Sequence, residues 1–201
     1  MVSFGFLRRL TGHLIISFVL TSLLNFVPTN NTGTVPYSLK VKKYVCTDTP
    51  YKESTLYSCK SIPRRNAPTL VQLTLNVPKL YNNVVVKVML FYKFSTYQPF
   101  MITIVGNACE FIRHPPEFGI EKHVYGVIAE TAPELLVPCP IGNRLYNITW
   151  CLEERHAPKN IPAGEYKIQF QLTIPPNVTL FAMDVYLVVR NTGIVSSFIS
   201  K

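Results

Sequence analysis

The side chains able to do acid–base or nucleophilic chemistry are few, and their spacing matches no common catalytic site. The chain has no Gly-x-Ser-x-Gly turn, no His-Glu-x-x-His pair and no glycine-rich phosphate loop. Cys151 would need a distant histidine to act as a nucleophile, so a buried, inert thiol is the simpler interpretation. Glu153 and Glu154 adjoin in a polar stretch, where neighbouring carboxylates are usually solvated. The four histidines are His13, His114, His123 and His156. We therefore predict a protein without enzymatic activity and without a cofactor.

The cysteines are the second set of reactive side chains. They are Cys46, Cys59, Cys109, Cys139 and Cys151. No pair has the Cys-x-x-Cys spacing and no cysteine–histidine pattern of a zinc site occurs, so we predict no metal site. In an oxidising compartment, an odd number of cysteines predicts two disulfides and one leftover thiol.

The first 25 residues have the pattern of a secretory signal peptide. Arg8 and Arg9 precede an uncharged apolar run at residues 14–24, which is shorter than the ~20 residues of a spanning helix. A retained anchor is the alternative, because no clear cleavage site follows. We predict a signal peptide at residues 1–25, an irregular leader at 26–37, one domain at 38–195 and a tail at 196–201. The protein is expected to be secreted and extracellular.

The composition excludes several classes of protein. Hydrophobic residues make up 48% of the chain and charged residues only 15%, which argues against disorder. The net charge of +9 is scattered, and its only clusters are Lys40, Lys42, Lys43 and Arg64, Arg65. These fit a solvated face, or at most a modest attraction to anionic head groups or glycans. We expect a monomer that does not bind nucleic acid.

Residues 161–190 contain the clearest pattern of structure, a long two-faced hairpin. Apolar residues alternate with polar ones at Tyr166, Ile168, Phe170, Leu172 and Ile174, and again at Phe181, Met183, Val185, Leu187 and Val189. Alternation of this kind places one face of each strand in the core. Pro175 and Pro176 end the first strand because proline cannot donate to the sheet. Asn177 at the predicted tip begins a glycosylation triplet, as do Asn30 and Asn147.

The remaining patterns predict more strands and one helix. The other strands are expected at residues 39–45, 56–62, 71–77, 84–94, 101–105 and 145–152. In the first of these, Leu39, Val41 and Val45 share one face and Tyr44 lies on the other, while Pro78 is expected to end the strand 71–77. Residues 84–94 are expected to form the wall opposite the hairpin. Residues 118–130 have helical spacing. The whole predicts an all-β antiparallel sandwich with one short helical insertion.

A set of short motifs resembles a known family. The motifs are Tyr92-Lys93-Phe94, Tyr97-Gln98-Pro99-Phe100, Cys109-Glu110-Phe111-Ile112, Cys139-Pro140 and Ile161-Pro162-Ala163-Gly164-Glu165-Tyr166. In this order the chain resembles, over roughly residues 38–195, an insect family of secreted domains of unknown function. That family is related to the myeloid-differentiation-2-related lipid-recognition (ML) proteins.

The resemblance implies an immunoglobulin-like sandwich whose two sheets part enough to admit an acyl chain. It also implies that Cys46 pairs with Cys59 and Cys109 with Cys139. Some insect relatives act in contact chemosensation and pheromone response. Two departures stand out: residues 135–137 are Leu-Leu-Val where the family is polar, and Cys151 is extra. Cys151 is therefore expected to be a free thiol or to pair with another molecule.

Two functions follow, and the fit of the side chains between the sheets separates them. The first is a carrier or sensor of a lipid or other hydrophobic small molecule. The second is a protein-interaction module with a filled core, which docks a membrane receptor or channel through an exposed apolar loop at residues 135–137. Aromatic side chains between the strands favour a cavity. Its candidate lining residues are Val88, Leu90, Phe94, Phe100, Phe111, Phe118, Tyr125, Phe170, Leu172 and Met183.

Overall fold

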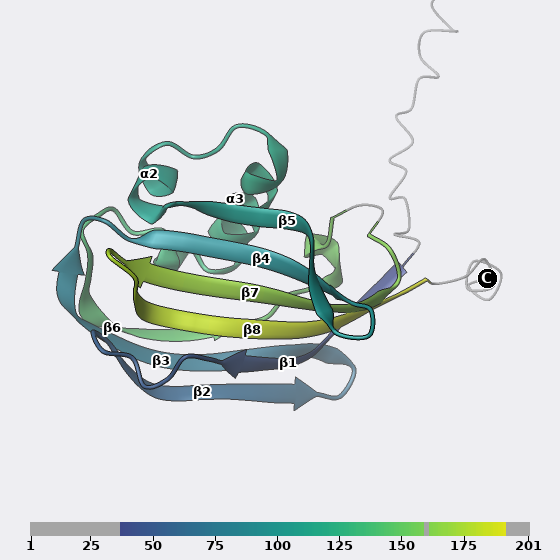
Figure 1. The fold of residues 1–201 in the computed structure, drawn as a ribbon. Coiled ribbons are helices and arrows are strands. Elements are labelled where there is room, and N and C mark those ends of the chain that lie inside the picture. Colours follow the sequence, from purple (N-terminus) through teal and green to yellow (C-terminus); the bar gives the residue numbers. More distant parts are fainter. Residues whose placement is uncertain (1–36, 159–160, 192–201) are drawn as a thin grey trace, which may run out of the picture. The chain divides into compact units, whose positions relative to one another are not determined.

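The computed structural model describes residues 37–158 and 161–191, which form two antiparallel sheets (Figure 1). The larger sheet has the order β1-β8-β7-β4-β5, and the smaller has the order β2-β3-β6. Their bounds are β1 Tyr37–Cys46, β2 Thr55–Arg64, β3 Ala67–Tyr81, β4 Val85–Lys93, β5 Tyr97–Asn107, β6 Ile141–Trp150, β7 Gly164–Ile174 and β8 Val178–Asn191. The predicted signal peptide, Asn30 and the tail lie outside the described residues. The all-β antiparallel sandwich is confirmed.

The core lies between the two sheets, as the alternation of apolar residues predicts. The larger sheet contributes the inner row of β8, which is Phe181, Met183, Val185, Leu187 and Val189, every one buried. The smaller sheet contributes Val71, Leu73, Leu75 and Val77 of β3, with Tyr146 and Ile148 of β6. The predicted hairpin is confirmed, since β7 and β8 pair antiparallel from Gly164 to Ile174, and Asn177 at its tip is exposed.

The predicted place of residues 84–94 was wrong. They form β4, but β4 is hydrogen-bonded beside β7 in the same sheet, with Tyr92 opposite Tyr166 and Val88 opposite Phe170. The wall that faces the hairpin is the smaller sheet. Period-two alternation shows that a strand has one buried face, but it does not distinguish a neighbour in the sheet from a partner across the core.

Two local predictions failed because strands carry irregularities. In β1 the register shifts between Val41 and Lys43, so Tyr44 turns inward and is buried while Val45 turns to the other face. One extra residue reverses every side chain after it. Pro78 does not end β3, which continues to Tyr81 across a second shift between Val77 and Leu80. Proline is accommodated in a strand at such a shift.

The helical insertion is larger than predicted. The helix at residues 118–130 is α3, Gly119–Thr131, and a second helix, α2 Ala108–Arg113, precedes it. The Asn107 side chain caps α2 by accepting from the backbone N–H groups of Cys109 and Glu110 at 2.8 and 3.3 Å. Two 3-10 turns follow, η1 Pro133–Leu135 and η2 Glu154–His156. In the described part of the chain, no helix has the length and hydropathy of a membrane span.

Each open edge of the sandwich carries a disulfide. Cys46 on β1 pairs with Cys59 on β2, with Cα atoms 6.3 Å apart, and so joins the two sheets where their first strands form the edge. At the other edge, the segment from β5 to β6 contains α2 and α3 and is closed by Cys109–Cys139, with Cα atoms 5.7 Å apart. These are the pairs that the resemblance implies. The neighbouring positions of β1 and β2 in the chain suggest two paired strands of one sheet. They instead belong to different sheets, which the disulfide links.

Two of the motifs behind the family resemblance meet in space. Tyr92 lies opposite Tyr166 with ring centroids 5.1 Å apart, and its hydroxyl donates to the Ala163 carbonyl at 3.2 Å. Lys93 and Lys42 both pair with the Glu165 carboxylate at 2.9 Å. Gly164 has a φ of +156°, and a Cβ there would lie 2.4 Å from the Tyr92 ring. This junction joins β1, β4 and β7.

We predict that Gly164→Ala destabilises the protein by about 1–3 kcal/mol, because alanine is strained at this φ and also meets the Tyr92 ring. Gly126→Ala is the matched control. A Cβ at Gly126 would meet nothing within 4 Å, so alanine inside α3 should stabilise by about 1 kcal/mol. Urea unfolding of the disulfide-intact proteins measures both changes. Equal midpoints for Gly164→Ala and the wild type would contradict the account of the junction.

The Glu165 ion pairs predict a pH dependence of stability. Hydrogen bonds from Lys42 and Lys93 lower the pKa of Glu165 from 4.5 to about 2. The folded protein therefore favours the ionised carboxylate, so this stabilisation is complete above the ordinary pKa and is lost as pH falls through about 2. We expect Glu165→Gln to flatten the acid side of the pH profile of the unfolding free energy. Glu134→Gln, at a residue without an ion pair among the described residues, should leave the profile unchanged.

Candidate ligand-binding site

The inner face of the larger sheet is not covered evenly. On β8 the inner row is buried throughout, but on β7, the central strand, only Tyr166 is fully buried. The next three inner residues of β7, Ile168, Phe170 and Leu172, are half-buried, although hydrogen-bonded strands flank them on both sides. Phe100 and Ile102 on β5 are half-buried as well. Between them, Val88 and Leu90 on β4 are buried, and so is Ile104 on β5. The partly accessible inner residues therefore lie on β7 and at one end of β5, on either side of β4.

The unequal widths of the two sheets explain this pattern. Three strands lie over five, so the inner faces of β4 and β5 must be covered by the helical segment that follows β5 (Figure 1). That cover is loose, because no side chain of α3 is fully buried. Ile120, Val124 and Ile128 form an apolar stripe on α3, and each is half-buried.

Polar contacts hold α3 in place. Trp150 Nε1 donates to Thr131 Oγ1 at 2.7 Å, which ties the end of the helix to β6. His123 Nε2 lies 2.9 Å from the His156 carbonyl oxygen, which ties the middle of the helix to η2. Hydrogen bonds of this kind fix the position of a helix without requiring its side chains to be fully buried.

Aromatic side chains stand at both ends of the half-buried row. At one end, the Tyr92 ring lies 5.4 Å from the Phe100 ring and 5.1 Å from the Tyr166 ring. Burial raises the pKa of Tyr166 to about 12, so its hydroxyl stays neutral and donates to the Pro162 carbonyl at 2.7 Å. At the other end, the ring centroids of Phe170 and Phe181 are 6.1 Å apart. The strand from Tyr166 to Phe170 measures about 13 Å, which suits an extended acyl chain of about ten carbons.

The structure separates the ten candidate lining residues into two groups. Six lie on the inner face of the larger sheet: Val88, Leu90, Phe100, Phe170, Leu172 and Met183. Phe94 and Phe118 do not, since they are 64% and 83% exposed at a turn and at the start of α3. Phe111 packs over Gly106 on β5, and Tyr125 is half-buried on α3. That any of these residues binds a ligand stays a prediction.

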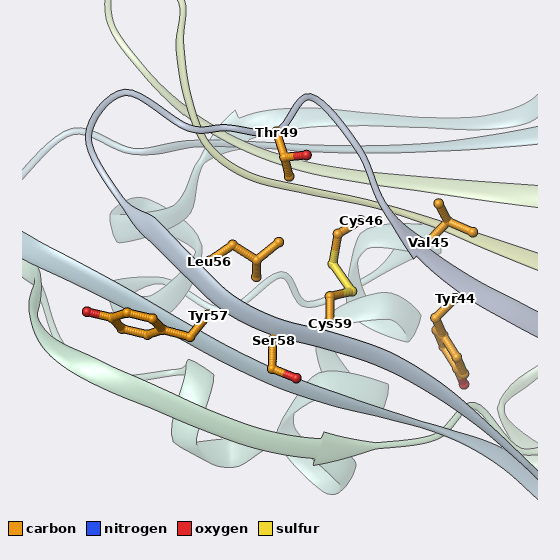
Figure 2. A pocket seen from close by; sticks show the side chains of 8 residues that line it. All are labelled: Tyr44, Val45, Cys46, Thr49, Leu56, Tyr57, Ser58 and Cys59. Carbon is orange, nitrogen blue, oxygen red and sulfur yellow. A yellow bond between two sulfur atoms is a disulfide. The ribbon is translucent and has the colours of Figure 1, made fainter.

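A hollow of about 380 Å³ lies at the opposite edge of the sandwich, between β1 and β2 (Figure 2). Its lining includes Tyr44, Leu56 and both sulfurs of the Cys46–Cys59 bridge. Figure 2 shows the bridge spanning the gap, with Leu56 inside it and Tyr57 pointing away. None of the ten candidate residues lines this hollow. Because the disulfide crosses this edge, we place the access to the inner face at the β5 side.

The structure also places the apolar residues 135–137 and Cys151. Residues 135–137 were expected to be exposed, but all three are half-buried and Leu135 packs against the core. Cys151 is the free cysteine of the described residues and is partly buried. Burial, then the nearby Glu153 carboxylate, raises the pKa of its thiol, which fits the predicted inert thiol.

A second hollow, of about 460 Å³, lies between α3 and η2, and the sequence analysis did not predict it. Glu153 and Glu154 were predicted to lie in a polar, solvated stretch, yet His156 in the same stretch is 5% exposed. The helical spacing of Lys122, His123, Gly126 and Glu130 places them on one face of α3. That spacing was the available signal. In the described ranges, no group of three or more His, Cys, Asp or Glu residues could hold a metal ion.

A family model matches part of the chain. Residues 86–168 match the family described as "Protein of unknown function (DUF1091)". The crystal structure of a Niemann-Pick type C2 protein from Japanese carpenter ant is similar at 15% identity and a TM-score of 0.35, over 71% of this chain and 96% of that chain. The crystal structure of chicken MD-1 complexed with lipid IVa is similar at 14% identity and a TM-score of 0.33, over 79% of this chain and 99% of that chain. No curated protein matches the chain in sequence.

The family match extends from β4 to the middle of β7 and includes both helices. The chain is therefore similar, over these residues, to a family of unknown function, as the motifs predicted. The insect origin and the chemosensory role that the resemblance implies stay predictions. The two solved structures are too distant to add an argument about the ligand.

Proposed function

We propose that this protein is a secreted, non-enzymatic binder of a lipid or other hydrophobic small molecule, held against the inner face of β7, β4 and β5. One observation carries the proposal: Ile168, Phe170 and Leu172 on the central strand of five are only half-buried. In a sandwich with a filled core, the inner residues of the central strand are its best buried ones. A ligand would complete the burial that α3 leaves incomplete.

The energy of binding would come from apolar burial. Covering apolar surface gains about 25 cal/mol per Å², or about 0.8 kcal/mol for each CH₂ group of an acyl chain. The residues on this face are aliphatic and aromatic, with the neutral hydroxyl of Tyr166 turned to a backbone carbonyl. The site therefore suits a ligand with an uncharged, flexible apolar group, and binding needs no covalent step.

The docking alternative loses its main support. It depended on an exposed apolar loop at residues 135–137, but all three residues are half-buried and Leu135 packs against the core. Glycosylation remains part of the proposal, because Asn147 and Asn177 are both exposed. A role in chemosensation or pheromone response is the further extension that the resemblance suggests, and the tissue of expression would test it.

A space-filling substitution tests the proposal. We predict that Ile168→Phe leaves the free energy of unfolding nearly unchanged but weakens binding of a fluorescent fatty-acid analogue by about tenfold, the equivalent of losing about two CH₂ groups of burial. Val185→Phe is the matched control. Val185 is the cross-strand partner of Ile168 and is 2% exposed, so a larger ring should cost about 1–3 kcal/mol of stability. Equal destabilisation by the two substitutions would show a filled core and end the proposal.

Native mass spectrometry of the glycosylated protein secreted from insect cells gives an independent measurement. We expect a bound apolar compound whose mass is lost after organic extraction, and whose place a fatty acid can take on reloading. Protein that is free of ligand and accepts none after extraction would contradict lipid binding.

A further inference from the structure

The hollow between α3 and η2 has the properties of a polar binding site that the proposed function does not use. One face of α3 supplies Lys122, His123, Gly126 and Glu130, and η2 supplies Arg155 and His156. None of its lining residues belongs to the inner face of the larger sheet. A Cβ at Gly126 would meet nothing within 4 Å, so the middle of this helix face opens onto free space.

The buried histidine holds an unused hydrogen-bond donor. The His156 side chain is 3% exposed, and its Nδ1 accepts from the Glu153 backbone N–H at 3.2 Å. Because Nδ1 is the acceptor, the neutral ring carries its proton on Nε2. Burial first, and the nearby Arg155 second, lower the pKa of His156 and so favour that neutral ring. Nε2 has no hydrogen-bond partner within the described residues, a rare condition for a buried polar atom.

The nearest anion to that donor belongs to the protein itself. Glu130 contacts Arg155 through Oε1, while its Oε2 stands 4.0 Å from His156 Nε2, which is too far for a hydrogen bond. The Glu130 side chain is 51% exposed and can rotate outward into solvent. Arg155 would stay in place, since its Nε also donates to Glu153 at 2.9 Å.

The charge of the hollow favours an added anion. Lys122 is exposed and makes no ion pair with the described residues. Among the lining residues, Lys122 and Arg155 outweigh the single carboxylate of Glu130, and the Glu153 carboxylate that also pairs with Arg155 lies outside the lining. When Glu130 rotates away, a guanidinium, an ammonium and the Nε2–H of His156 border the same space.

We propose that this hollow binds an oxyanion, a carboxylate or phosphate group, which takes the place of the Glu130 carboxylate on Arg155 and accepts the free Nε2–H of His156. The group can belong to a free anion or to the head of an amphiphile. The ligand-binding face between the sheets is not required, because the two sites share no residue.

Histidine NMR of the full secreted protein tests the proposal directly. Acetate and inorganic phosphate are titrated while the ring nitrogens of ¹⁵N-labelled histidine are observed. We expect a saturable shift of His156 Nε2 with both probes. Glu130→Gln should tighten binding severalfold because it removes the competing charge. Lys122→Ala should weaken binding severalfold, while Lys60→Ala on β2 should have no effect.

A steric pair separates the site from general surface attraction. Gly126→Leu should abolish the saturable shift by filling the hollow, whereas Gly126→Ala should retain it.

Octanoate distinguishes the two sources of the oxyanion. Tighter binding of octanoate than of acetate indicates an amphiphile head group, and equal binding indicates a free anion. Absence of a saturable shift in both the wild type and Glu130→Gln would overturn the proposal. A shift that Lys122→Ala and Lys60→Ala reduce equally would also overturn it, and neither surface variant should affect folding. Ile168→Phe should leave anion binding unchanged, so the two proposals can fail separately.

Discussion

The unequal width of the two sheets is the constraint from which the rest of the structure follows. A strand pair needs another apolar layer to bury its inner face, and three strands cannot supply that layer for five. β8 lies under the smaller sheet and is buried along its whole inner row. β7 differs from β8, because its inner row is fully buried at Tyr166 and half-buried from Ile168 onward. The proposed binding surface lies along this half-buried row.

A sandwich with such an uncovered margin needs its edges fixed by other means. The two disulfides do this, one at each open edge, and each closes a loop that the chain-entropy treatment values at about 3 kcal/mol. The junction of Tyr92, Gly164 and Glu165 supplies a third fixed point inside the larger sheet. Because these points hold the sheets, the fold does not depend on tight packing of α3, which has no fully buried side chain.

The periodicity of the sequence predicted the strands well, because each long strand has one wet and one buried face. It could not predict which strands are neighbours: β4 and β7 have the same alternation whether they pair or face each other. The shift at Val41 and Lys43 has no clear sign in composition, so Tyr44 was placed on the wrong face. For the candidate site, alternation correctly placed Phe170 and Leu172 on the inner face. It could not show that β4 ends before Phe94, and aromatic content could not show that Phe118 is exposed, since an aromatic residue in a turn can equally well lie at the surface.

The helix α3 connects the two surfaces that this chain leaves open. Its apolar stripe of Ile120, Val124 and Ile128 is half-buried, and hydrogen bonds from His123 and Thr131 join the helix to η2 and β6. A helix held by these contacts without a fully buried side chain is not packed tightly, and Gly126 at its centre removes one further contact. Tight packing of α3 would bury the inner face of β5 and close the hollow beside His156 together. The same loose attachment therefore leaves both the apolar face and the polar hollow accessible, on two sides of one helix.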